Sequence, residues 1–157
     1  MSVAFSAILF PADFSELSLR ALNCAKGMAE QFGSSLHCIH IVDEAYQYWT
    51  GVSPESVPIG PPPDELLEIG QQRMARFVSE HMADLPKAPI THVMLGRPFA
   101  GIVQYARQHE IDMIVMATHG RGGIAHVLLG STAEKVVRKA HCAVLTVRTA
   151  EGEFVHP

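Results

Sequence analysis

The sequence predicts an α/β protein: a doubly wound, three-layer α/β/α sandwich whose parallel five-stranded sheet is covered by helices on both faces. Two observations lead to this fold class. Short apolar runs alternate four times with segments of helical periodicity, which is typical of parallel strands joined by crossover helices. The 157 residues are 48% hydrophobic and 18% charged, a composition that provides a sizeable core for one domain. The apolar runs cover residues 4–10, 35–42, 88–95, 112–117 and 142–147.

The first strand and helix are predicted from a change of period. Residues 4–10 (AFSAILF) are continuously apolar, as expected for a strand that is buried on both faces. Residues 15–32 carry apolar side chains at spacings of three and four, which predicts an amphipathic helix, and Gly33 provides its stop signal. The second strand follows at 35–42. The helix face expected to point inward comprises Ala21, Leu22, Ala25, Met28, Ala29 and Phe32.

Residues 43–63 interrupt this rhythm. They contain five prolines and three aromatic residues without a clear period, which predicts a long surface excursion of the kind that is often functional or mobile. Asp64 then opens a second helix, and the strand at 88–95 leads into a turn and short helix at 96–110, with Pro98 near its first position. The inward faces of these two helices are expected to comprise Leu67, Met74, Phe77, Val78 and Met82, and Phe99, Ile102, Val103 and Ala106.

The last unit is a strand, a helix and a strand. The strands are expected at 112–117 and 142–147, with a helix at 131–140 between them. We expect one domain over residues 1–148 and a loosely held C-terminal tail at 149–157. The helix residues expected to point inward are Ala133, Val136, Val137 and Ala140.

Composition argues against several classes of function. The formal net charge of -4 at pH 7, without a long basic block, argues against nucleic acid as the main partner. No apolar run approaches the roughly 20 residues needed to span a bilayer, and the N-terminus has no positively charged leader, so we expect neither a membrane partner nor a signal peptide. Three scattered cysteines without a CxxC pair indicate reduced core thiols in a cytoplasmic protein.

The chain has nine histidines, but their spacing predicts no metal site. His37 and His40 are three apart within the second strand and should therefore point to opposite faces of the sheet. No HxxxH motif on a helix and no Cys/His cluster is present, and structural metal sites need such ligand groups.

Functional residues are expected in the loops at the carboxyl edge of the sheet, because ligands of such sheets bind there, where the strand order reverses. One of these loops reads THGRGGIAHVLLGST (118–132). Its match to GxGxxA (120–125) is not a dinucleotide fingerprint, because it does not follow the first strand and no acidic residue lies about 20 positions on. The nucleotide P-loop is excluded because no Gly-Lys-Ser/Thr is present.

Three features of this edge have two interpretations each. Ser131 and Glu134 fit a capping box in which Ser131 is the N-cap, but the same helix N-terminus, preceded by Gly130, also suits an anion such as phosphate. Asp13, just beyond the first strand, fits a helix cap or a carboxylate that accepts hydrogen bonds from ribose hydroxyls. His119 fits a loop histidine bonded to the backbone or a general base.

Nearly the whole chain resembles the universal stress protein family. The resemblance is carried by ILFPADFSELSLRALNCAKGMAEQFGSSLHCIHIVDE (8–44) and by the stretch from LGRPFAGIVQYARQHE to HCAVLTVR (95–148). Of these, the second stretch is the more specific.

The most specific motif lies in the second stretch. Nucleotide-binding members of the family carry a glycine, two residues, a glycine, nine residues, and then Gly-Ser or Gly-Thr. Gly120, Gly130 and Ser131 fit the last parts of this pattern, with residues 121–129 as the nine. Ala117 occupies the place of the first glycine.

The resemblance implies an adenine nucleotide alpha hydrolase-like fold with strand order 3-2-1-4-5 and a site for ATP, with or without Mg²⁺. Main-chain amides at the two glycines would hold the phosphates, Asp13 would contact the ribose, and the main chain at Ile41 would meet the adenine. Pro11 and Ala12 would flank the base, and Arg121 would add a nearby cation. The implied nucleotide-binding residues are Pro11, Ala12, Asp13, Ile41, Met116, Ala117, Gly120, Arg121, Gly130, Ser131 and Thr132.

By this resemblance the protein is a cytoplasmic, ATP-binding module of the stress response that acts through unknown protein partners and hydrolyses ATP slowly at most. The resemblance also implies a homodimer through the strand at 142–147, and an apolar edge strand left open invites such pairing unless the tail covers it. Two other functions stay open: a nucleotide-free interaction module in which Ala117 blocks the site, and an ATP-hydrolysing enzyme with His119 as its base. Flavin-dependent electron transfer is a third.

Overall fold

The computed structural model describes residues 4–43, 60–119 and 129–148. No helix in these ranges has the length and apolar character needed to cross a membrane. The surface excursion predicted at 43–63 lies almost entirely outside the described residues, as does the tail at 149–157.

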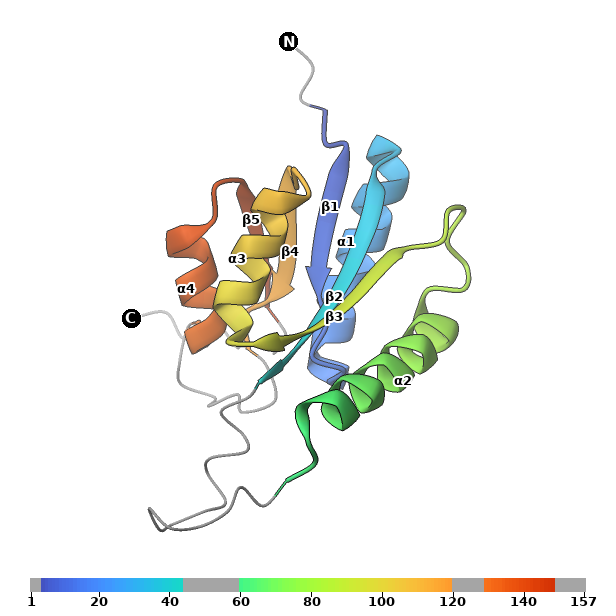
Figure 1. The fold of residues 1–157 in the computed structure, drawn as a ribbon. Coiled ribbons are helices and arrows are strands. Elements are labelled where there is room, and N and C mark those ends of the chain that lie inside the picture. Colours follow the sequence, from blue (N-terminus) through green and yellow to red (C-terminus); the bar gives the residue numbers. More distant parts are fainter. Residues whose placement is uncertain (1–3, 44–59, 120–128, 149–157) are drawn as a thin grey trace, which may run out of the picture.

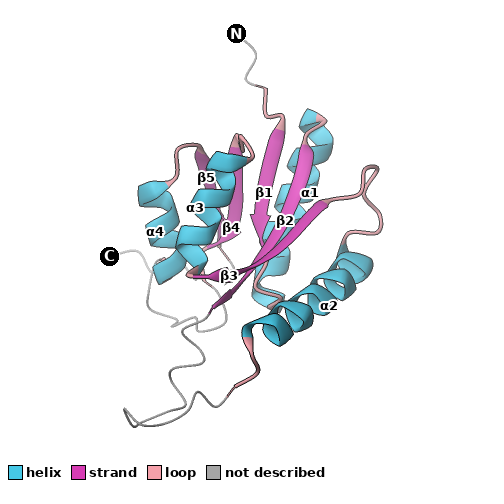
Figure 2. Ribbon diagram, in the orientation of Figure 1, coloured by secondary structure: helices cyan, strands magenta, loops and turns pink. Residues whose placement is uncertain are grey.

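Five parallel strands form one sheet in the order β3-β2-β1-β4-β5, which confirms the predicted fold class and strand order (Figures 1 and 2). The long β2–β3 pairing runs in register from His37↔Ile90 to Asp43↔Gly96. β5 pairs with β4 over its whole length and forms one edge of the sheet. The strands are β1 (Ala7–Pro11), β2 (Ser35–Asp43), β3 (Ile90–Gly96), β4 (Met113–Ala117) and β5 (Ala143–Val147).

The helices follow the strands as crossovers, and two of their ends lie where the sequence signals predict. Gly33 ends α1 in the left-handed conformation (φ 66°), which glycine adopts without steric cost. Pro98 is the first residue of α3, where its missing N–H is not needed. The helices are the short 3₁₀ helix η1 (Glu16–Ser18), α1 (Leu19–Phe32), α2 (Pro63–His81), α3 (Pro98–Gln108) and α4 (Ser131–Lys139).

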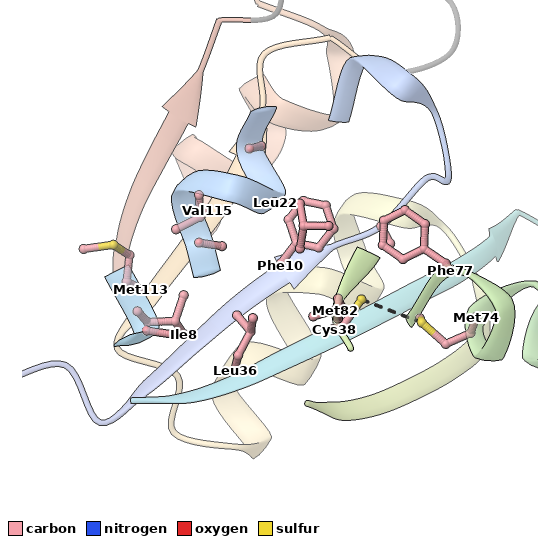
Figure 3. Packing of buried hydrophobic residues seen from close by; sticks show 14 residues of the cluster. Ile8, Phe10, Leu22, Leu36, Cys38, Met74, Phe77, Met82, Met113 and Val115 are labelled. Atoms are coloured by element: carbon pink, nitrogen blue, oxygen red, sulfur yellow. Dashed lines mark hydrogen bonds between the residues drawn. The ribbon is translucent and has the colours of Figure 1, made fainter. Parts of the chain in front are cut away.

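α1 and α2 cover one face of the sheet and bury the first of two hydrophobic layers (Figure 3). The ring of Phe10 in β1 stacks against Phe77 of α2, with centroids 6.4 Å apart. The Cys38 thiol lies 3.7 Å from the sulfur of Met74, and burial raises its pKa to about 12, so it stays a protonated core thiol. Other members of this layer are Ile8, Leu22, Leu36, Met82, Met113 and Val115.

α3 and α4 cover the opposite face and bury the second layer (Figure 2). Its strand residues alternate with those of the first layer, because successive side chains of a strand point to opposite faces. The members from the strands are Ala7, Leu9, Ile39, Ile41, Ile114 and Met116, and those from the helices include Ile102, Tyr105, Ala106, Ala133 and Val136.

His37 and His40 point to opposite faces, as predicted from their spacing. His37 lies in the second layer, where its Nδ1 is 2.9 Å from the Tyr105 hydroxyl. Nδ1 of His40 lies 2.7 Å from the Ala12 carbonyl oxygen, and its ring contacts Phe14, which belongs to the first layer. Among the described residues no group of three or more His, Cys, Asp or Glu side chains is arranged to hold a metal ion.

Some residues predicted to point inward were assigned wrongly. Phe32 and Val137 are 44% and 47% exposed. Phe32 is the last residue of α1, where its ring packs edge-on against Phe5. Tyr105, which periodicity did not select, is buried instead, since His37 supplies the partner that its hydroxyl needs.

Two glycines in helices have different surroundings and give a matched test of packing. A Cβ on Gly101 of α3 would lie 2.9 Å from Cγ1 of Ile41, whereas a Cβ on Gly27 of α1 would meet nothing within 4 Å. Alanine favours a helix over glycine by about 1 kcal/mol, and overpacking a core costs roughly 1–3 kcal/mol. We therefore expect Gly27→Ala to raise the free energy of unfolding by about 1 kcal/mol and Gly101→Ala to lower it, as measured by urea denaturation. Equal stabilisation by both substitutions would contradict the close approach of α3 to β2.

The burial of His37 predicts a loss of stability in acid. Burial, and the nearby His109, lower the pKa of His37 below its ordinary value of 6.5, so the unfolded chain takes up the proton first. The stability that is linked to the neutral His37 is therefore fully present above pH 6.5, and it is lost progressively as the pH falls below that value. In His37→Asn, which keeps a polar group near Tyr105, urea denaturation at about pH 8 and about pH 5.5 should show a smaller loss than in the wild type. The exposed His92 provides the control: His92→Asn should retain the wild-type loss, and equal losses in all three proteins would contradict the prediction.

Candidate functional site

The candidate site lies at the carboxyl edge of the sheet, between the ends of β1 and β4. These two strands are neighbours, but β1 continues into α1 on one face and β4 leads to α4 on the other (Figure 1). The direction of winding thus reverses between β1 and β4, and such a switch point is where α/β sheets of this type bind ligands.

The turn after β1 is fixed by hydrogen bonds to both main chain and side chains. The Ala12 amide donates to the Ile39 carbonyl (2.7 Å), which continues the β1–β2 pairing past Pro11. Oδ1 of Asp13 accepts hydrogen bonds from the amide (2.9 Å) and the hydroxyl (2.6 Å) of Ser15. Ser15, at the N-cap of η1, accepts in turn from the Ser18 amide. The helix-cap interpretation of Asp13 is therefore wrong, because Asp13 orders the turn in front of the cap.

The α4 side of the site is built from main chain. The Gly130 amide donates to the Thr118 carbonyl (2.7 Å), and a Cβ on Gly130 would lie 3.0 Å from that same oxygen. Gly130 has φ −67°, so glycine is needed here for close approach rather than for a left-handed backbone. The end of β4 and the start of α4 are in direct backbone contact for this reason.

The capping box predicted for α4 is wrong. Gly130, not Ser131, occupies the N-cap position, and no side chain in the described part of the chain makes a hydrogen bond that caps the helix. The first helical bond runs from the Glu134 amide to the Gly130 carbonyl (2.9 Å), so the amides of Ser131, Thr132 and Ala133 precede the helical ladder. Amides that lie outside the helical ladder and the positive end of the helix dipole together favour an anion at this position.

Ala117 fits the sheet without strain. It is the last residue of β4, pairs in register with Val147, and packs its methyl against the α1–α2 layer. In the described part of the chain, Phe14 and Glu110 are the non-glycine residues with positive φ, and Ala117 is not among them. The penalty that a left-handed backbone imposes on alanine does not arise at this position.

Of the other residues predicted for the site, one lies at the end of a strand and two have their side chains in the second hydrophobic layer. Pro11 is half-buried at the end of β1, and Met116 belongs to the second layer. The side chain of Ile41 is buried against Gly101, so only its main chain is available to a ligand. Gly120 and Arg121 lie outside the described residues.

Sequence reasoning missed two residues at this edge, Phe14 and His40. Phe14 directly follows Asp13 and has φ 61°, and its ring lies 4.3 Å from that of His40. No local pattern predicts either role, because the contacts join a loop to a strand that lies more than 20 residues away. His119, for which the sequence left a loop role and a general-base role open, places its Nδ1 3.1 Å from the Thr118 hydroxyl.

Known proteins share this architecture. Universal stress protein MJ0531 of Methanocaldococcus jannaschii is 32% identical to this chain over 156 residues, or 95% of this chain and 85% of the relative. The solved structure of protein MJ0577 of the same organism has a TM-score of 0.78 and 26% identity, with coverage of 96% of this chain and 100% of that one. The Archaeoglobus fulgidus universal stress protein in complex with dAMP has a TM-score of 0.63 at 20% identity, with coverage of 92% and 98%.

A model of the universal stress protein family matches residues 4–148, nearly the whole chain. The match includes both connections that form the candidate site, and it agrees with the resemblance that the motifs after β1 and β4 predicted. The chain belongs to the universal stress protein family.

Proposed function

We propose that this protein is an ATP-binding module of the stress response that works as a homodimer in the cytoplasm and hydrolyses ATP slowly at most. The site consists of Asp13 and its turn on one side and the N-terminus of α4 on the other. Residues 1–148 form its single domain. Mg²⁺, where it takes part, is held by the phosphates or by Asp13, since it keeps most of its waters and needs few protein ligands.

The uncapped N-terminus of α4 is the observation that carries this proposal. Three consecutive amides, those of Ser131, Thr132 and Ala133, precede the helical ladder beside the end of β4. A phosphate group can accept hydrogen bonds from such amides without displacing a capping side chain. Gly120 and Arg121 complete the phosphate loop in this proposal, as the family pattern suggests.

Asp13 supports the sugar end of the site. Its Oδ1 is engaged by Ser15, and among the described residues its Oδ2 accepts no hydrogen bond. A carboxylate oxygen held by a rigid turn is a suitable acceptor for the paired hydroxyls of a ribose. The relative from Archaeoglobus fulgidus is in complex with dAMP, which supports an adenine nucleotide as the ligand class.

Asp13→Asn should weaken ATP binding by roughly 10- to 100-fold, because a hydrogen bond to a charged group contributes roughly 1.5–3 kcal/mol. Asparagine keeps an oxygen for Ser15, so the turn is retained while the charge is lost. Titration calorimetry with ATP measures the effect. Asp84→Asn is the matched control, because it removes an equally charged but exposed carboxylate in the connection between α2 and β3. Equal affinities for the wild type and Asp13→Asn would contradict the assignment of Asp13.

Ala117→Gly separates this proposal from a nucleotide-free module. The Ala117 methyl packs against the α1–α2 layer, so its removal should change ATP affinity little. Binding that is seen in Ala117→Gly but not in the wild type would support the nucleotide-free alternative.

β5 supports the proposed dimer. The Ala143 amide donates to Asp112, and the Val147 carbonyl accepts from Thr118, so the polar groups of these residues point toward β4. Since main-chain direction alternates along a strand, the amides and carbonyls of Val144 and Thr146 face the open edge. No described strand pairs with that edge, and unpaired edges favour strand addition.

Thr146→Pro should convert the dimer into a monomer, because proline removes an outward amide without affecting the hydrogen bonds to β4. Sedimentation velocity measures the mass of the wild type, of Thr146→Pro, and of a form without residues 149–157. The truncated form controls for cover by the tail and should remain a dimer. A monomer in the wild type and in the truncated form alike would contradict pairing through β5.

A further inference from the structure

The turn that carries Asp13 contains a strained residue. Phe14 has φ 61°, a left-handed conformation that costs a non-glycine residue roughly 1–2 kcal/mol. Such residues persist only where surrounding contacts impose them, and they gather at functional sites. The contacts around Phe14 therefore indicate which parts of the structure hold this conformation.

β2 provides the first contact. The ring of His40 packs on that of Phe14 with centroids 4.3 Å apart and an interplanar angle of 37°. Nδ1 of His40 is also 2.7 Å from the Ala12 carbonyl oxygen. Because a carbonyl oxygen only accepts, His40 must carry a proton on Nδ1 and donate it. One histidine thus contacts the turn on both sides of Asp13.

α2 provides the other contacts. The ring of Phe77 meets Phe14 edge-on, with centroids 5.4 Å apart and an angle of 60°. The guanidinium carbon of Arg73, one turn earlier on α2, lies 5.0 Å from the centre of the Phe14 ring, a favourable cation–π arrangement. Phe77 is buried in the first hydrophobic layer, so the turn is anchored to the core through this ring.

We propose that Phe14 is a positioning residue: held by His40, Phe77 and Arg73, its ring imposes the left-handed turn that orders Asp13, and it couples α2 to the nucleotide site. This inference rests on the proposed function for its ligand, but the ordering of the turn does not. Asp13 contacts the ribose in this scheme, whereas Phe14 acts through Asp13. A shift of α2 at Arg73 and Phe77 would therefore alter nucleotide affinity without touching the nucleotide.

The test uses two readouts on the full-length protein. Phe14→Ala should weaken ATP binding by about tenfold in titration calorimetry. It should also speed hydrogen exchange of the Ser15 amide, which donates to Asp13, as measured by NMR. The Leu22 amide in α1 should exchange unchanged, which excludes general unfolding. Phe14→Tyr, which keeps the ring, should restore both values.

A surface variant tests the coupling without disturbing the core. Arg73→Gln should weaken ATP binding by about two- to fivefold, the amount expected for an exposed cation–π contact. Arg76→Gln is the matched control: it removes the same charge from the same helix, where Arg76 pairs with Glu80 rather than with Phe14. Equal effects of the two substitutions would show general electrostatics and would overturn the coupling.

The outcomes separate this inference from the proposed function. If the wild type binds ATP, both readouts must change in Phe14→Ala, and a change in only one, or in neither, overturns the positioning role. If the wild type binds no ATP, the proposed function fails. Faster exchange of the Ser15 amide would then still support the ordering of the turn by Phe14, and unchanged exchange would overturn it.

Discussion

The central strand β1 must be kept from water on both faces, and the arrangement of the rest of the chain follows from this constraint. Ile8, Leu9 and Phe10 are each 0% exposed, because two helical layers cover them from opposite sides. A chain that covers both faces with crossover helices must reverse its winding beside β1. The same requirement that buries the core therefore creates the edge at which polar groups gather.

The two halves of the candidate site are held by different means. Side chains fix the turn after β1, where Asp13 binds Ser15 and His40 holds Ala12. Main-chain contact sets the start of α4 against the end of β4, where Gly130 meets Thr118 with no room for a side chain between them. A carboxylate positioned by side chains and a set of amides positioned by backbone thus lie at the same edge of the sheet, and such groups can bind a sugar and a phosphate respectively.

The sequence predicted the fold class and, by resemblance, the strand order. It also predicted the described strands and α-helices to within a few residues, because periodicity and Gly or Pro signals are local. The sequence-based predictions were wrong for helix capping and side-chain burial where these depend on contacts between residues far apart in the chain. Ser131 and Glu134 match a capping box, yet the close approach of Gly130 to Thr118 moves the cap by one residue. Val137 fits the apolar stripe of α4, yet nearly half of its surface is exposed.

The candidate site could be predicted from the sequence only in part. Asp13 and the glycine motif stand out in the sequence because they follow strands and match a family pattern. The positive φ of Phe14 left no signal, since the side chains that impose it come from β2 and α2. Such a residue becomes visible only when the backbone conformation is known.

The three thiols of this chain differ in how accessible they are to alkylating reagents. Cys24 and Cys142 are half-buried, whereas Cys38 lies fully enclosed between β2 and α2, beside Met74. Alkylating reagents attack the thiolate, and the raised pKa of Cys38 together with its burial protects it until that enclosure opens. The rate at which Cys38 is alkylated therefore reports how often α2 separates from the sheet. Mass spectrometry can measure this rate without adding a probe to the protein.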